Sequence, residues 1–169
     1  MAKNALLERS IREENATVGF ISRAFWIATQ YLMSNQEPWL TEVMVFFKTK
    51  GDNKDADTDL HQSLQYEFEG GWGQIAYAQG WYWEFATGSY VGPLSLALLV
   101  SYPPTKRSIP GRTQYQISIT PRGGWGTIGS DSWTHVTFEL YLTFSDGSQL
   151  LYSDTFSLSI SSPSYSFNL

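Results

Sequence analysis

The hydrophobic positions of this chain follow two different periods. Before Pro38 they recur every three or four residues, the spacing of an α-helix, and after Pro38 they alternate every second residue, the spacing of a β-strand. We therefore expect a mainly β protein, an antiparallel β-sandwich or jelly roll of about eight strands with a long N-terminal α-helix. This pattern divides the chain into residues 1–36, the helix, and residues 37–169, the β domain.

The expected helix carries a heptad seam that Glu14 interrupts, and the seam is formed by Leu7, Ile11, Val18, Ile21, Phe25, Ala28 and Leu32. Arg23 is the only charged residue between Val18 and Met33, so this half is apolar on nearly every side. A helix that is apolar all round must be covered all round. We expect packing on its own β domain, homo-oligomer formation through the seam, or insertion at a membrane surface. A transmembrane span is not expected, because the apolar run is shorter than the ~20 residues required, and neither is a secretory signal peptide.

The β domain reads as a series of short alternating segments separated by turn residues. Asp146-Gly147 lies between two of them and predicts a hairpin. The tail, residues 164–169, alternates as well, and it predicts either a last edge strand or an extension that pairs with a neighbour's edge. The expected strands cover residues 42–48, 59–68, 74–78, 81–86, 93–101, 114–119, 134–144 and 149–160.

Composition narrows the possible partners and chemistry. The net charge is −5, and no Lys or Arg follows Arg122, so we do not expect a nucleic-acid partner. The chain has no cysteine, which excludes disulfides, thiolate zinc sites and a cysteine nucleophile. Aromatic residues make up 16% of the chain, and this surplus indicates interfaces, sugars or lipid headgroups as contacts.

One short segment occurs twice. Residues 70–76 and 123–129 share five of seven positions, including Gly-Gly-Trp-Gly. Glycines around a tryptophan either present the ring to a ligand or set it into a corner of the fold. Under the first interpretation, aromatic Gly-Trp loops stack on sugar rings or anchor in a headgroup layer. The candidate ligand-binding residues are Trp72, Trp81, Trp83, Trp125, Trp133, Tyr82 and Tyr141.

An acidic loop follows the first expected strand. Its four carboxylates suit Ca²⁺, the candidate cofactor, and the candidate ligands are Asp52, Asp55, Asp57 and Asp59. An EF-hand is excluded, because Leu60 stands where that loop needs glycine and Tyr66 where it needs the bidentate glutamate. The loop is similar to the calcium-binding loops of C2 and PLAT domains, a resemblance that implies contact with membrane or lipid-protein surfaces. The alternative is a solvated acidic turn.

The layout of the whole chain resembles that of the actinoporins. The shared features are an amphipathic N-terminal helix, a cysteine-free β domain, a similar length and many Tyr and Trp residues. The resemblance implies a helix that detaches and inserts into a membrane, while aromatic loops hold phospholipid headgroups. This chain departs from it in being acidic.

Catalytic signals are weak. His61 and His135 both fall on expected strands and read as ordinary surface residues. A glycosidase would need a carboxylate pair, and the candidates are Glu84 or Glu67 against Glu139, with Tyr82 and Tyr141 nearby.

We therefore expect a non-enzymatic, self-associating protein that binds a glycan or lipid-headgroup surface through its aromatic Gly-Trp loops. One alternative is a structural subunit of a shell, filament or virion. The other is a membrane-inserting, pore-forming protein. The sequence does not predict a cellular location.

Overall fold

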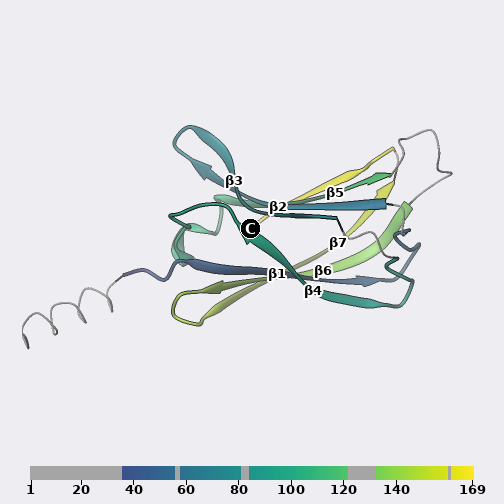
Figure 1. The fold of residues 1–169 in the computed structure, drawn as a ribbon, viewed down its shortest axis with the longest axis horizontal. Coiled ribbons are helices and arrows are strands. Elements are labelled where there is room, and N and C mark those ends of the chain that lie inside the picture. The colour runs from purple at the N-terminus through teal and green to yellow at the C-terminus, as the bar shows by residue number, and fades with distance from the viewer. Residues whose placement is uncertain (1–35, 56–57, 81–83, 122–131, 160) are drawn as a thin grey trace, which may run out of the picture. The chain divides into compact units, whose positions relative to one another are not determined.

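The computed structural model describes residues 36–55, 58–80, 84–121, 132–159 and 161–169. Within them, eight antiparallel strands form one nearly closed sheet in the order β7-β6-β1-β4-β3-β2-β5-β8 (Figure 1). The prediction of a mainly β protein is confirmed. The predicted N-terminal helix lies outside the described residues, as do its seam residues Leu7, Ile11, Val18, Ile21, Phe25, Ala28 and Leu32.

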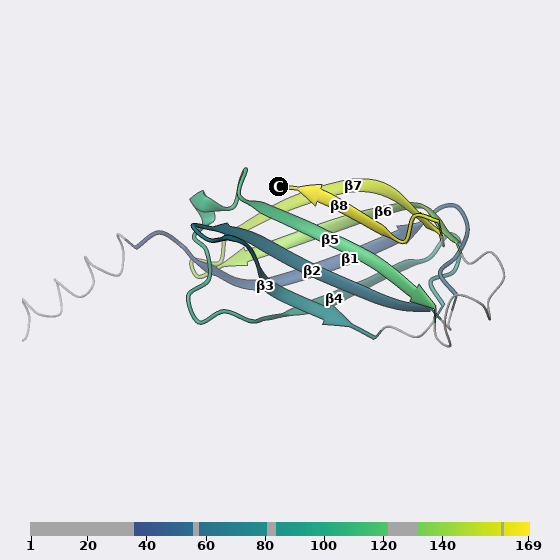
Figure 2. The same ribbon diagram turned by 90° about the horizontal axis from the view of Figure 1, so that it is seen from above.

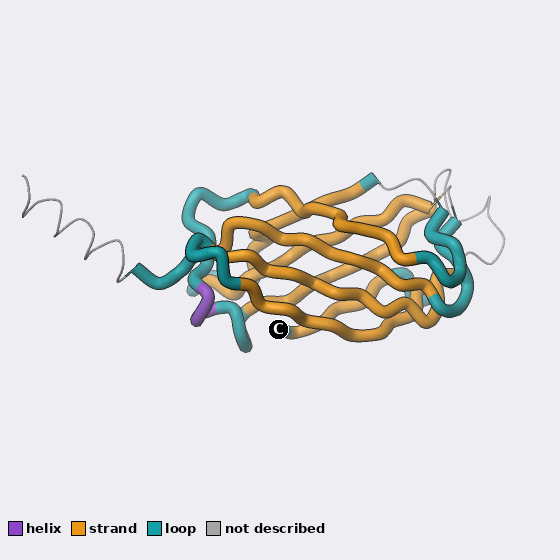
Figure 3. Tube along the Cα trace, turned by 90° about the horizontal axis from the view of Figure 1, so that it is seen from below, coloured by secondary structure: helices purple, strands orange, loops and turns teal. Residues whose placement is uncertain are grey.

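Most strands extend their expected ranges slightly, whereas β4 begins and ends three residues before its expected range. The strands are β1 (Leu40–Thr49), β2 (Thr58–Phe68), β3 (Gly71–Gln79), β4 (Tyr90–Leu98), β5 (Thr113–Pro121), β6 (Ser132–Phe144), β7 (Gln149–Ser159) and β8 (Ser164–Asn168). One short 3-10 turn, Lys106–Ser108, is the only helical element of the described residues. Figure 3 shows it among the loops at one end of the strands. In the described part of the chain, no helix has the length and hydrophobicity needed to cross a bilayer.

The structure tests the strand expected over residues 81–86 and the role of the tail, residues 164–169. The strand expected over 81–86 is not present in its described part, where Phe85 makes only an isolated bridge to Lys54. The reason is that Phe85 plugs the end of the core, with ring contacts to Phe47 and Trp133. The tail is an edge strand in its own chain, since β8 pairs with β5 from Ser118↔Ser164 to Gln114↔Asn168.

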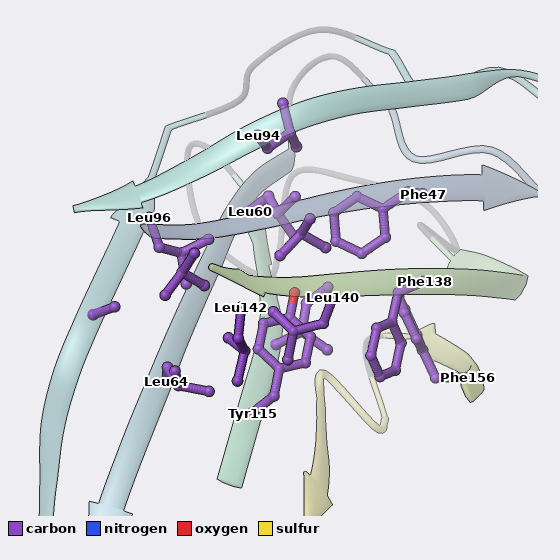
Figure 4. Close-up of a cluster of buried hydrophobic side chains, with 14 of the residues drawn as sticks. Phe47, Leu60, Leu64, Leu94, Leu96, Tyr115, Phe138, Leu140, Leu142 and Phe156 are labelled. Atoms are coloured by element: carbon purple, nitrogen blue, oxygen red, sulfur yellow. The ribbon is translucent and has the colours of Figure 1, made fainter. Parts of the chain in front are cut away.

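The sheet curves so that its two halves face each other across one hydrophobic core (Figures 1 and 2). One half is β7-β6-β1-β4 and the other is β3-β2-β5-β8. Alternation explains the core, because every second side chain of a strand points inward. Val45 and Phe47 of β1 are fully buried, as are Leu60 and Leu64 of β2. Figure 4 shows side chains from both halves pointing into this shared core.

Two narrow connections join the halves. On one side, β3 pairs with β4 only through Ala76↔Leu98 and Tyr77↔Ala97. On the other side, β7 and β8 meet through side chains: the Tyr165 ring stacks on Phe156 at 5.5 Å, and Tyr165 Oη donates a hydrogen bond to Asp154 Oδ2. The sheet therefore closes through side-chain contacts, and we call this second connection the latch.

The predicted hairpin between β6 and β7 is confirmed. Gly147 has φ 79°, a value that favours glycine, and its amide donates to the Phe144 carbonyl at 2.8 Å. Asp146 Oδ1 accepts from the Ser148 amide at 2.9 Å. The turn thus holds its two strands in register.

Candidate functional site

The outward face of β3-β2-β5-β8, which we call the groove face, carries a groove of about 430 Å³. It forms because alternate residues of four neighbouring strands face solvent together. Among the described residues that line it, none is Lys, Arg, Asp or Glu. Apart from Ile117, the lining residues offer polar side chains or backbone, and they are His61, Gln62, Ser63, Gln65, Gln74, Tyr77, Gln116, Ile117, Ser118, Thr120, Ser164, Tyr165 and Ser166.

A row of side-chain amides crosses this face. Gln65 Nε2 donates to Gln116 Oε1 at 2.7 Å, and Gln116 Nε2 donates to Gln114 Oε1 at 2.7 Å. Gln114 Nε2 in turn donates to Asn168 Oδ1 at 2.9 Å. We call these four residues the amide row. Each amide has two N–H donors and a carbonyl with two lone pairs, so the row retains capacity both to donate to a ligand and to accept from it.

A second network borders the groove. His61 Nδ1 lies 3.0 Å from Tyr77 Oη, and His61 Nε2 lies 3.2 Å from Asp59 Oδ2. Tyr77 Oη donates to Gln79 Oε1. Partial burial, and then the negative charge of Asp59, raise the pKa of Tyr77. Near neutral pH the Tyr77 phenol therefore keeps its proton, and the network presents a neutral hydroxyl to the groove.

An exposed tryptophan extends the groove face toward the β2–β3 turn. Trp72 lies opposite Glu67 of β2, both face outward, and Trp72 is 50% exposed. It precedes the groove residue Gln74 by two positions, roughly 7 Å along a strand. One of the predicted ligand-binding aromatics therefore stands next to the amides, on the same face.

The other predicted aromatics have different fates. Trp133 is fully buried, and its indole Nε1 donates to Thr49 Oγ1 at 2.9 Å. A ring without an exposed face cannot stack on a ligand, so Trp133 belongs to the core and its prediction as a binding residue is corrected. Trp81, Tyr82, Trp83 and Trp125 lie outside the described residues.

Only the first copy of the repeated Gly-Trp segment lies within the described residues. The first copy enters β3 at Gly71, beside the end of β2 at Phe68. The second copy follows Pro121, which pairs with Thr58 at the beginning of β2. Thr58 and Phe68 are ten steps apart, or roughly 34 Å along a strand. The described residues Gly71 and Pro121 therefore pair with opposite ends of β2, and the second copy itself lies outside the described residues.

The outward face of β7-β6-β1-β4, which we call the aromatic face, has another character. The Phe46 ring stacks on Tyr90 at 5.4 Å and meets Tyr141 edge-on at 5.5 Å. Both phenols donate to Glu139 Oε2, Tyr90 at 2.9 Å and Tyr141 at 3.2 Å. Desolvation, the hydrogen bond to Glu139 and the Glu139 charge raise the pKa of Tyr141 and raise that of Tyr90 to about 12. The predicted residue Tyr141 thus belongs to an aromatic cluster built around a carboxylate.

One of the two predicted glycosidase pairs, Glu67 with Glu139, is not assembled. Glu67 faces outward from β2 and Glu139 outward from β6, so the core separates them. Glu84 lies in the loop before Phe85, where it accepts from Asn53 Nδ2 at 2.6 Å. A carboxylate pair that flanks one bond needs both groups in one cleft, which excludes Glu67 with Glu139, and the pair of Glu84 with Glu139 stays a prediction.

The acidic loop is organised around a cation of its own. The Lys54 side chain is fully buried, and its Nζ donates to the Thr58 carbonyl at 2.6 Å and to the Asp55 carbonyl at 3.0 Å. Asp59 Oδ2 lies 3.2 Å from His61 Nε2, and Asp59 Oδ1 accepts a hydrogen bond from the Gly80 amide at 2.9 Å. Among the described residues, no group of three or more potential metal ligands comes together. Asp57 lies outside the described residues, and the Ca²⁺ ligand set of Asp52, Asp55, Asp57 and Asp59 stays a prediction.

Sequence reasoning predicted the strand over residues 59–68 but missed the groove. The available signal was the choice of polar residue, since β2 and β5 present Gln, Ser and Thr outward where Lys and Glu are more usual on an exposed strand. His135, the other histidine, is exposed at a bulge of β6 with φ 50° and lies outside the groove lining. Comparisons with protein-family models, with curated proteins and with solved structures found no match for this chain.

Proposed function

We propose that the β domain is a non-enzymatic binding module for neutral glycans. The site is the groove with its amide row, and Trp72 is the aromatic platform at one end. The observation that supports this most directly is the lining itself, whose described residues include no Lys, Arg, Asp or Glu.

The chemistry of the lining selects among ligand classes. A phosphate or sulfate ligand needs Lys or Arg donors, and a cationic ligand needs carboxylates. An apolar ligand needs an apolar wall. Sugar hydroxyls both donate and accept, which matches amides and hydroxyls that do the same. A sugar ring also has an apolar face that an exposed tryptophan can cover. Neutral glycans therefore fit better than lipid headgroups, which the sequence alone left open.

The test is binding of the full chain to an immobilised set of neutral, sulfated and sialylated oligosaccharides, followed by calorimetry with the best neutral one. Trp72→Ala removes the platform, and Gln116→Ala removes the centre of the amide row. Each is expected to weaken binding by about tenfold, because a change of about 1.4 kcal/mol corresponds to a factor of ten in Kd.

Two matched controls come from residues outside the groove. Tyr102→Ala removes an aromatic ring that is 92% exposed, and Gln149→Ala removes an exposed amide on β7. Both are expected to leave the affinity within about twofold, well under the 1.4 kcal/mol that a tenfold change requires. Equal losses in controls and test variants would contradict the proposal, and so would a preference for sulfated sugars or for phosphatidylcholine vesicles.

Self-association through residues 1–36 stays a prediction. Its test is the light-scattering mass of the full chain against a chain that starts at Glu37. An oligomer would multiply weak single-site binding by avidity, and equal monomeric masses would remove that part of the hypothesis.

A further inference from the structure

Tyr90 presents an aromatic ring to solvent on the aromatic face. One side of the ring stacks on Phe46, with ring planes only 16° apart, yet Tyr90 remains 56% exposed. Across the strands Tyr90 lies beside Lys48, whose side chain is exposed. The ring is thus backed by protein on one side and open on the other, which is the arrangement of a stacking platform.

Glu139 fixes the platform and keeps a free acceptor. Its Oε2 accepts from both Tyr90 Oη and Tyr141 Oη, which holds the two phenols in place. Its Oε1 has no hydrogen-bond partner among the described residues. A carboxylate has about four lone-pair sites, so a ligand that covers Tyr90 can donate a hydrogen bond to Oε1. A nearby Lys48 ammonium adds a donor for a ligand oxygen.

We propose that Tyr90, Glu139 and Lys48 form a second sugar site, on the face of the domain opposite the groove. The ligand class is a sugar ring that stacks on Tyr90 and donates a hydroxyl hydrogen bond to Glu139. A purely apolar ligand would leave the carboxylate without a partner, and the adjacent ammonium disfavours a cation. The inference rests on the proposed function, and it adds that one chain is bivalent and can bridge two glycan-bearing surfaces without forming an oligomer.

The experiment starts from the full chain with its groove disabled by Trp72→Ala and Gln116→Ala. This chain is expected to retain binding to part of the immobilised neutral oligosaccharide set. Adding Tyr90→Ala is expected to abolish the remainder, whereas Tyr90→Phe keeps the ring and is expected to retain most of it. Tyr102→Ala serves as the control for loss of an exposed ring.

The outcomes separate the two proposals. If the wild-type chain binds sugars and the groove-disabled chain binds none, the second site is wrong and the groove proposal stands. If the wild-type chain binds no sugar, both are wrong. If Tyr102→Ala removes the residual binding as Tyr90→Ala does, the binding is nonspecific and the second site is wrong. Tyr90→Ala in a chain with an intact groove checks the fold, because groove binding must then be unchanged.

Discussion

The two outward faces of this sheet share one core but present different chemistry. The groove face carries amides and hydroxyls whose hydrogen bonds run from strand to strand. The aromatic face carries stacked rings gathered around one carboxylate. Both faces arise from the same alternation of inward and outward residues. The difference shows that a strand's inward residues set the fold, while its outward residues are free to set a separate function on each side.

The largest effect is expected from a substitution in the core that both faces share. Phe138 of β6 is fully buried and contacts Tyr115 of β5 at 5.1 Å and Phe167 of β8 at 5.5 Å, so it joins the two halves. Phe138→Ala is expected to lower the free energy of unfolding by about 3–5 kcal/mol. Denaturant unfolding measures this loss. A smaller loss, confined to one face, would show that the halves are stable separately.

The next prediction acts on the aromatic face alone. Gly92 has φ 141°, and a Cβ there would lie 2.8 Å from the Val45 carbonyl oxygen and 2.7 Å from a Phe46 ring carbon. Gly92→Ala is expected to cost about 1–3 kcal/mol and to displace Phe46 from Tyr90. Unfolding and near-ultraviolet circular dichroism measure the two effects. Gly70→Ala is the control, since nothing lies within 4 Å of its Cβ position, and groove binding should survive both changes.

An alkaline titration tests the latch between β7 and β8, where the two halves of the sheet meet. Desolvation, the hydrogen bond to Asp154 and the charge of Asp154 raise the pKa of Tyr165 from 10.0 to about 12. The folded state therefore holds this proton more tightly than the unfolded state, so the stabilisation is complete below pH 10 and is lost as the pH rises toward about 12. Tyr165→Phe is expected to cost about 1 kcal/mol near neutral pH and to flatten the decline of stability in that window. An unchanged decline would mean that the latch does not contribute.

The smallest effect on stability is expected at the amide row. Gln116→Ala removes an outward side chain and should change the free energy of unfolding by only about 0.5 kcal/mol. Its effect on neutral glycan binding should be much larger. A stability loss comparable to that of Gly92→Ala would indicate that the row holds the sheet together instead of serving a ligand.

Sequence reasoning succeeded where the two-residue period is unbroken. The strand expected over residues 42–48 has Val43, Val45 and Phe47 at alternate positions, and all three are fully buried. The prediction of Trp133 as a ligand-binding residue was wrong. A bulge changes the phase of β6 between Trp133 and Val136, where His135 takes φ 50°. After such a bulge, residues of odd and even number both point inward. A local backbone irregularity of this kind leaves no clear trace in the hydrophobic pattern.

The candidate sites depend on register between distant segments. Gln65 meets Gln116 across 51 positions of the chain, and Tyr90 meets Glu139 across 49. Each residue alone reads as an ordinary polar or aromatic position on a strand. Only the alignment of β2 with β5, and of β4 and β6 on either side of β1, brings them together. The period of a sequence predicts which face a residue occupies, but it does not predict the neighbour across the strand.

The amide row has a further consequence for how the molecule responds to its medium. At 0.1 M salt, dissolved ions largely screen attractions between exposed charges that are more than about 10 Å apart, but they have little to screen between neutral amides. The chain has a net charge of −5, but the hydrogen bonds of the amide row join neutral groups only. The groove is therefore expected to hold a neutral glycan equally well in dilute buffer and in seawater-like brine.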